Sequence, residues 1–223
     1  MKPWITLAAE PSPDGEQLLL QERDGVFVIR VAGRELMSSA RHGSEEAMAQ
    51  AALRGLQAQR PSVLIGGLGL GYTLRAALDR LPPRASVVVV EISEAVVAWN
   101  RGLLSQLAGE PLADPRVRVE VAEIGRFLST SRRRFDAILL DVDNGPSALF
   151  REGNRELYRR PGLETFSSAL RPGGALVIWS AGAAPRFVEE LRRAGFDASE
   201  QRVAARDGGK ARHVLIVGRS RQS

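Results

Sequence analysis

The sequence of 223 residues predicts an α/β fold, in which a doubly wound, mostly parallel sheet follows a small N-terminal antiparallel β unit. The main observation is an apolar, strand-like run at 62–66. It leads through the glycine-rich segment 66–71 into a helix, and a second apolar run follows at 86–91. Strand-like and helical segments alternate after it, as in βαβ units. The runs 87–90 and 137–140 are apolar without interruption, which is typical of parallel strands covered on both faces.

Residues 1–42 are predicted to form the N-terminal β unit. Asp24-Gly25 separates two β-rich runs, 17–22 and 26–31, and this dipeptide in that setting is a strong hairpin signal. A hairpin of this size is only marginally stable alone. We therefore expect the unit to take part in a homodimer.

Residues 43–60 are predicted to be a linking helix. Glu45 and Glu46 follow Ser44 in what would be the first turn, where acidic side chains favour helix formation. Pro61 marks the break before the first parallel strand.

Residues 61–218 are predicted to form the main domain, and 219–223 a basic tail. Strands are expected near 62–66, 86–91, 116–121, 135–141 and 174–180, with a closing pair near 198–204 and 212–217. Helices are expected near 71–81, 93–105, 123–130, 161–170 and 184–194.

The glycine loop is the best candidate for a ligand site. Gly67, Gly69 and Gly71 read GxGxG, and glycine lets the backbone reach positive φ and approach a ligand closely. Glu91 follows at the tip of the next strand, where a carboxylate can accept both hydroxyls of a ribose. Dinucleotide sites usually read GxGxxG, but here Tyr72 stands in the place of the third glycine. A glycine-rich turn that binds nothing is the alternative.

Acidic residues follow two further strands. Glu123 can accept the amino group of adenine, or it can simply favour the first turn of its helix. Asp141 ends a buried strand beside the glycine loop, and with Asp143 and Asn144 it can hold and deprotonate an amine. Turn chemistry explains Asn144 equally well, and Asp143 can likewise cap the turn. Trp179 ends the strand at 174–180, where it either joins the core or faces an acceptor pocket.

The GxGxG spacing resembles motif I of class I S-adenosylmethionine (SAM) dependent methyltransferases. From 25 to 174 the chain resembles the spermidine synthase family, a branch of that Rossmann-like fold, in the β unit, glycine loop, acidic strand ends and Leu170-Arg171-Pro172-Gly173-Gly174. The resemblance implies a dimer, with SAM or decarboxylated SAM as group donor. It implies donor binding by Gly67, Leu68, Gly69, Gly71, Glu91, Ile92, Glu123 and Asp141. It also implies catalysis by Asp141 and Asp143, and an amine acceptor held by Asn144, Glu45, Glu46 and Trp179.

Departures from the family pattern bear on the transferred group. Aminopropyltransferases carry an acid inside the loop, as GGGDGG, and Gly69 stands at that place here. Leu36 replaces a glutamine of the N-terminal unit, and Met48 stands where an aromatic residue would. Without the loop acid, intact SAM meets no repulsion against its carboxylate, so methyl transfer is favoured over aminopropyl transfer.

Composition narrows the function classes. No cysteine is present, and His42 and His213 are the only histidines, so we expect no metal. No apolar run approaches the ~20 residues of a membrane span, and the N-terminus lacks a signal peptide, so we expect a cytoplasmic protein without membrane contact. The net charge is +5, but the basic runs lack interleaved aromatics, so we expect no nucleic-acid partner.

The sequence leaves three functions open. The first is an enzyme that moves a methyl or aminopropyl group to a small amine. The second is a non-catalytic nucleoside-binding or scaffold protein that keeps the fold. The third, an NAD-dependent reductase, is disfavoured by the GxGxG spacing and the closing strand pair.

Overall fold

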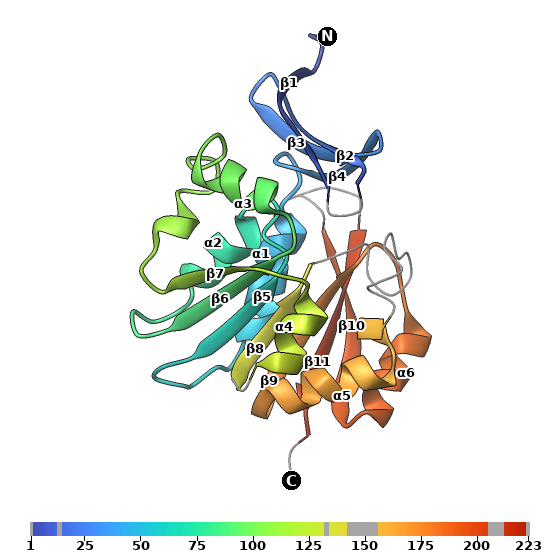
Figure 1. Ribbon diagram of the computed structural model, residues 1–223. Helices are drawn as coiled ribbons and strands as arrows, with labels where there is room; N and C mark the ends of the chain where they lie inside the picture. Colours follow the sequence, from blue (N-terminus) through green and yellow to red (C-terminus); the bar gives the residue numbers. More distant parts are fainter. Residues whose placement is uncertain (1, 13–14, 132–133, 142–155, 205–211, 222–223) are drawn as a thin grey trace.

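The structure is a computed structural model that describes residues 2–12, 15–131, 134–141, 156–204 and 212–221 (Figure 1). Two sheets are present in this part of the chain, a four-stranded N-terminal sheet and a seven-stranded sheet with helices on both faces. The predicted α/β fold with its antiparallel N-terminal unit is confirmed.

The N-terminal sheet is antiparallel, in the order β1-β2-β3-β4. Its strands are β1 (Ile5–Pro11), β2 (Gln17–Arg23), β3 (Val26–Val31) and β4 (Arg34–Ser38). Asp24 and Gly25 join β2 to β3 with positive φ angles of 50° and 80°, as a two-residue type I′ hairpin requires. The hairpin predicted from Asp-Gly is confirmed.

The linking helix is shorter than predicted. Helix α1 (Gly43–Leu53) ends seven residues before the expected boundary at 60. Arg54 has left the helical conformation (φ −59°, ψ 122°), and Gly55 follows at φ 72°. A glycine in the left-handed region just past a helix is a common stop signal, and it outweighs the helix-forming residues that follow.

The large sheet has the order β10-β11-β9-β8-β5-β6-β7, and β11 is antiparallel to both of its neighbours. Its strands are β5 (Ser62–Gly66), β6 (Ser86–Glu91), β7 (Val117–Val121), β8 (Phe135–Leu140), β9 (Leu170–Ser180), β10 (Phe196–Ala204) and β11 (Arg212–Ser220). The connecting helices are α2 (Tyr72–Leu78), α3 (Glu94–Arg101), η1 (Pro111–Ala113), α4 (Ile124–Thr130), α5 (Arg160–Ala169) and α6 (Pro185–Arg193). The order confirms the doubly wound sheet.

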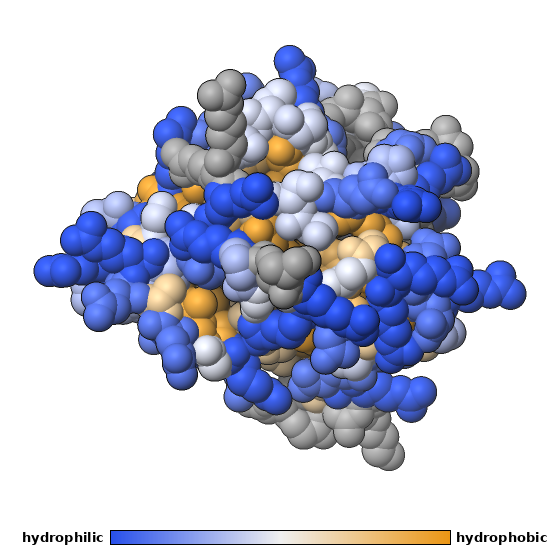
Figure 2. All heavy atoms as spheres, turned by 90° about the horizontal axis from the view of Figure 1, so that it is seen from below, coloured by the Kyte–Doolittle hydropathy of each residue, from blue (hydrophilic) through white to orange (hydrophobic). Residues whose placement is uncertain are grey.

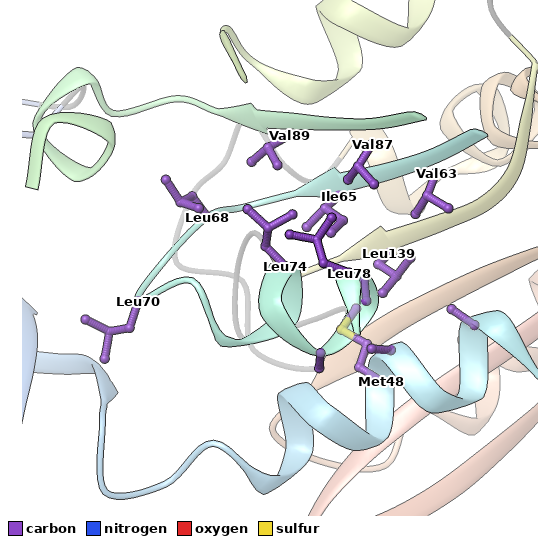
Figure 3. Packing of buried hydrophobic residues seen from close by; sticks show 14 of the residues in the cluster. Met48, Val63, Ile65, Leu68, Leu70, Leu74, Leu78, Val87, Val89 and Leu139 are labelled. Atoms are coloured by element: carbon purple, nitrogen blue, oxygen red, sulfur yellow. The ribbon is translucent and has the colours of Figure 1, made fainter. Parts of the chain in front are cut away.

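The core lies in two layers, one on each face of this sheet. Alternate residues of a strand enter opposite layers: Val87 and Val89 belong to the layer of α1, α2 and α3, and Val88 and Val90 belong to the layer of α4, α5 and α6. Figure 3 shows the first layer, where Met48 of α1 lies beside Leu78 of α2. The fully apolar central strands are therefore explained by burial on both faces.

The predicted basic tail is wrong at its start, because β11 continues to Ser220. The Arg219 guanidinium donates to the carbonyl oxygen of Arg54 at 2.7 Å, just past the end of α1. A cation at this position satisfies a carbonyl that the helix leaves unpaired. Arg219 thus fixes α1 to the sheet.

The surface is mostly hydrophilic on the face shown in Figure 2, with apolar residues visible only in small areas between charged ones. Across the residues described, no helix combines the length and apolar character needed to cross a membrane.

The homodimer stays a prediction, and strand β1 is where we expect it to form. In the described sheet β1 is an edge strand, with Ile5 57% and Leu7 38% exposed. An edge with unpaired backbone groups and apolar side chains favours pairing with another chain. We expect the double variant Ile5→Asp/Leu7→Asp to be a monomer by light scattering, while Leu103→Asp, also exposed (56%), leaves the mass unchanged. A monomeric wild type would contradict the prediction.

Candidate functional site

A cavity of about 460 Å³ lies between the N-terminal sheet and the carboxyl ends of the parallel strands. Ligands of open α/β sheets bind at this edge. The N-terminal sheet contributes mainly apolar side chains from β2, β3 and β4, including Leu18, Ile29, Leu36 and Met37. The large sheet contributes the glycine loop after β5 and the ends of β6, β7, β8 and β9.

The glycine loop uses its three glycines for two purposes. All three have positive φ, 90° at Gly67, 54° at Gly69 and 86° at Gly71. Gly67 and Gly69 line the cavity, and donor binding by them stays a prediction. Gly71 does not line it: it caps α2, and a Cβ there would lie 3.1 Å from the side chain of Asn100 and 3.3 Å from that of Pro111. Helix packing therefore explains the glycine at position 71, and its predicted place beside the ligand stays a prediction.

Gly69 is held from two sides. Its carbonyl oxygen accepts a hydrogen bond of 2.8 Å from the buried side chain of Asn100 on α3. A Cβ at Gly69 would lie 2.5 Å from both Sδ and Cε of Met37 on β4. The methionine of the N-terminal sheet therefore occupies the space that a side chain at position 69 would need. Sequence reasoning missed Asn100, whose only signal is a polar residue on the apolar face of a helix.

Glu91 fixes the loop to the end of β6. Its side chain is only 8% exposed, and its two carboxylate oxygens accept hydrogen bonds from the backbone N–H groups of Leu68 (2.8 Å) and Ser93 (2.9 Å). Leu68 contributes this N–H, and its side chain is buried as part of the hydrophobic cluster in the layer of α1, α2 and α3. Each oxygen keeps a further lone pair for a ligand hydroxyl. Ile92, 37% exposed, adds an apolar wall to the same cavity.

Glu123 serves the helix that it precedes. Its two carboxylate oxygens accept the N–H groups of Gly125 and Arg126, each at 2.7 Å, and so cap α4. The side chain also lines the cavity, beside Ala122 and Ile124. The helix role that the sequence left open is thus present, and a role toward adenine stays a prediction.

The part of the cavity wall formed by the end of β8 and the start of α1, here called the acidic end, carries two carboxyl groups, those of Asp141 and Glu45. Asp141 continues the ladder of β8, with its N–H donating to the carbonyl oxygen of Gly66 at 2.9 Å. Burial, together with the negative charges of Glu45 and Glu91, raises the pKa of Asp141 to about 8. Burial also raises the pKa of Glu45. Two carboxyl groups that disfavour each other's ionisation are suited to hold a cation and take up a proton.

Of the two glutamates on α1, only Glu45 lines the cavity. Glu46 is exposed and contacts Nδ1 of His42 at 2.9 Å, so the structure does not place it on the cavity wall. Successive helical residues point roughly 100° apart, and the cavity meets the side of α1 that carries Ser44 and Glu45. Asp143 and Asn144 lie outside the described residues.

Trp179 and His213 complete the acidic end. Trp179 lines the cavity, and its ring meets the His213 ring edge to face at 4.7 Å. Nδ1 of His213 lies 3.0 Å from Oγ of Ser44, which donates to Glu45 at 2.6 Å. Sequence reasoning missed His213 as a site residue, because no motif surrounds it. Within the described residues no group of three or more His, Cys, Asp or Glu side chains is placed to hold a metal ion.

Comparison with known proteins gives the family. Residues 42–190 match the spermine/spermidine synthase domain. The chain belongs to the spermine/spermidine synthase family. The matched segment of the chain runs from the start of α1 into α6. It carries Glu45, the glycine loop, Glu91, Glu123 and Asp141.

The curated relatives of this chain differ in the activities that their names state. Putrescine N-methyltransferase 3 of Nicotiana tabacum is 34% identical over 117 residues, 51% of this chain and 28% of the relative. Polyamine aminopropyltransferase 2 of Pseudomonas aeruginosa is 33% identical over 138 residues, 60% of this chain and 37% of the relative. The aligned segment thus spans only about a third of each relative's length. Spermidine synthase from Thermotoga maritima shares the fold, with a TM-score of 0.74 over 96% of this chain and 72% of that chain at 16% identity.

The raised pKa of Asp141 predicts how stability varies with pH. The carboxyl group of Asp141 ionises near 3.8 in the unfolded chain and near 8 in the folded protein. Its contribution to stability is therefore fully present below pH 4 and is lost as pH rises to about 8. The side chain of Asp141→Asn cannot ionise. The difference in free energy of unfolding between this variant and wild type should therefore shift by a few kcal/mol in favour of the variant as pH rises from about 4 to about 8.

Urea unfolding at pH 4.5 and pH 8.5 measures this difference. Asp197→Asn, an exposed aspartate on β10, is the matched control and should change stability by less than ~0.5 kcal/mol. A relative stability of Asp141→Asn that is the same at both pH values would show that Asp141 ionises normally in the folded protein.

Proposed function

We propose that this protein transfers a methyl group from SAM to a nitrogen of a small amine of the polyamine class. The observation that carries the proposal is that one cavity is lined by the glycine loop and Glu91 together with Asp141 and Glu45. The names of the curated relatives, a putrescine methyltransferase and a polyamine aminopropyltransferase, support an amine acceptor.

The donor end fits an adenosyl group. The free lone pairs of Glu91 suit the two ribose hydroxyls, and Gly67 lets the backbone approach the ligand. Ile92 offers an apolar surface against which adenine can pack. Holding the donor here places its sulfonium centre near the acidic end, where the acceptor binds.

The acidic end fits an amine that must lose a proton before it reacts. An ammonium group is attracted by Glu45 and Asp141, and ionised Asp141 can accept its proton. The freed nitrogen lone pair then forms a bond to the methyl carbon as the carbon–sulfur bond breaks, and the sulfonium becomes a neutral thioether. Asp141 afterwards releases its proton to water, and a pKa of about 8 lets it do both near neutral pH.

Methyl transfer is favoured over aminopropyl transfer because of the contact between Met37 and Gly69. Aminopropyltransferases carry an acid at the position of Gly69, whereas Met37 fills that space here. No carboxylate of the glycine loop therefore opposes the carboxylate of intact SAM.

The proposal is tested by incubating the protein with putrescine, cadaverine or spermidine and with SAM or decarboxylated SAM. We expect methylated amine from SAM, and a loss of at least roughly 100-fold in kcat for Asp141→Asn. Glu91→Gln should instead raise the KM for SAM roughly tenfold or more, since it weakens hydrogen bonds to a charged group. If no amine reacts with either donor, a non-catalytic nucleoside-binding protein becomes the better interpretation.

A paired substitution tests the choice of donor. Gly69→Asp alone should displace the flexible end of the Met37 side chain, since its Cβ would lie 2.5 Å from Sδ and Cε. In Met37→Ala/Gly69→Asp the space is free, and aspartate tolerates positive φ better than most residues. We expect the ratio of kcat/KM for SAM over decarboxylated SAM to fall roughly tenfold relative to the Met37→Ala control, through repulsion between carboxylates. An unchanged ratio would show that position 69 does not select the donor.

A further inference from the structure

The acidic end of the cavity contains a hydrogen-bonded chain of three side chains, His213, Ser44 and Glu45. Nδ1 of His213 lies 3.0 Å from Oγ of Ser44, and this hydroxyl donates to Oε2 of Glu45 at 2.6 Å. All three residues line the cavity. The contact joins β11 to the first turn of α1 across 169 positions of sequence.

The direction of these hydrogen bonds follows from the number of protons available. Ser44 has one hydroxyl proton, and it is donated to the Glu45 carboxylate. The proton in the contact between Ser44 and His213 must then belong to Nδ1 of the ring, so His213 donates to Ser44. Burial and the positive charge of Arg41 lower the pKa of His213, which favours the neutral ring. The chain therefore runs from His213 through Ser44 to Glu45.

The surroundings fix this chain in one arrangement. The Trp179 ring meets the His213 ring at an interplanar angle of 67°, and the two residues lie on neighbouring antiparallel strands. Ser44 is 1% exposed, so its hydroxyl has no contact with bulk water. The charged or titratable side chains that act on the group are Glu45 itself, Asp141 at the end of β8, Arg41 before α1, and His42 and Glu46 beside Glu45. A short hydrogen bond from a buried hydroxyl orients the carboxylate that accepts it.

We propose that His213 is a positioning residue for the amine acceptor: through Ser44 it holds the Glu45 carboxylate toward the cavity, where an ammonium group binds. The inference rests on the proposed function and adds the residue that prepares its acceptor site. His213 lies beyond residue 190, where the match to the family ends. The family match therefore does not include His213 and gives it no role in acceptor binding.

The test separates the donor role of Nδ1 from the simple presence of a side chain. His213→Asn keeps an N–H close to the position of Nδ1, while His213→Leu has similar size and no donor. Binding of putrescine is measured by calorimetry on protein saturated with methylthioadenosine. We expect His213→Leu to weaken putrescine binding roughly tenfold and His213→Asn to stay within about threefold of wild type. Methylthioadenosine should bind all variants equally.

His42→Asn is the matched control. The His42 ring stacks on Tyr72 and contacts Glu46 outside the cavity, and it acts on Glu45 only through its charge, so putrescine binding should stay within about threefold of wild type. Wild-type affinity in His213→Leu, or equal weakening by Leu and Asn, would overturn the inference and leave the proposed function intact. If wild type binds methylthioadenosine but no putrescine, both the inference and the amine acceptor are wrong, while the nucleoside site stands.

Discussion

The buried carboxylate of Glu91 is the interaction on which the site depends. It accepts backbone N–H groups from Leu68 in the glycine loop and Ser93 at the start of α3, and so joins two βα connections at the carboxyl edge of the sheet. The loop has positive φ at three glycines, and this carboxylate, together with the hydrogen bond from Asn100 to Gly69, fixes where its backbone lies. The negative charge of Glu91 also acts on Asp141 at the acidic end of the cavity and helps to raise its pKa.

Burying several carboxyl groups around one cavity lowers the stability of the folded protein. The same burial also determines which ligands the cavity favours. Glu91 is stabilised by backbone N–H groups and Glu45 by the hydroxyl of Ser44. Burial nevertheless raises the pKa of Glu45 and, more strongly, that of Asp141. A cationic ligand would relieve this repulsion, since an opposite charge favours the ionised carboxylates. The site is thus electrostatically prepared for an ammonium group and poorly suited to an anion.

The N-terminal sheet shapes the cavity as much as the large sheet does. Met37 of β4 lies against Gly69 in the space that a side chain at position 69 would need, while Leu36 and Ile29 line the wall beside it. The segment that matches the family begins only at residue 42, so these three residues of the N-terminal sheet lie outside it.

The sequence alone determined the fold, the hairpin at Asp24-Gly25 and the places of Gly67, Gly69, Glu91 and Asp141. These features depend on local periodicity, on turn chemistry and on the rule that parallel strands end at one edge. Only the tertiary structure decided that Glu45 rather than Glu46 faces the cavity and that Gly71 serves helix packing. It alone brought His213 to Ser44, across 169 positions. Such choices depend on the rotation of a helix and on which strands become neighbours, and neither leaves a signal in nearby residues.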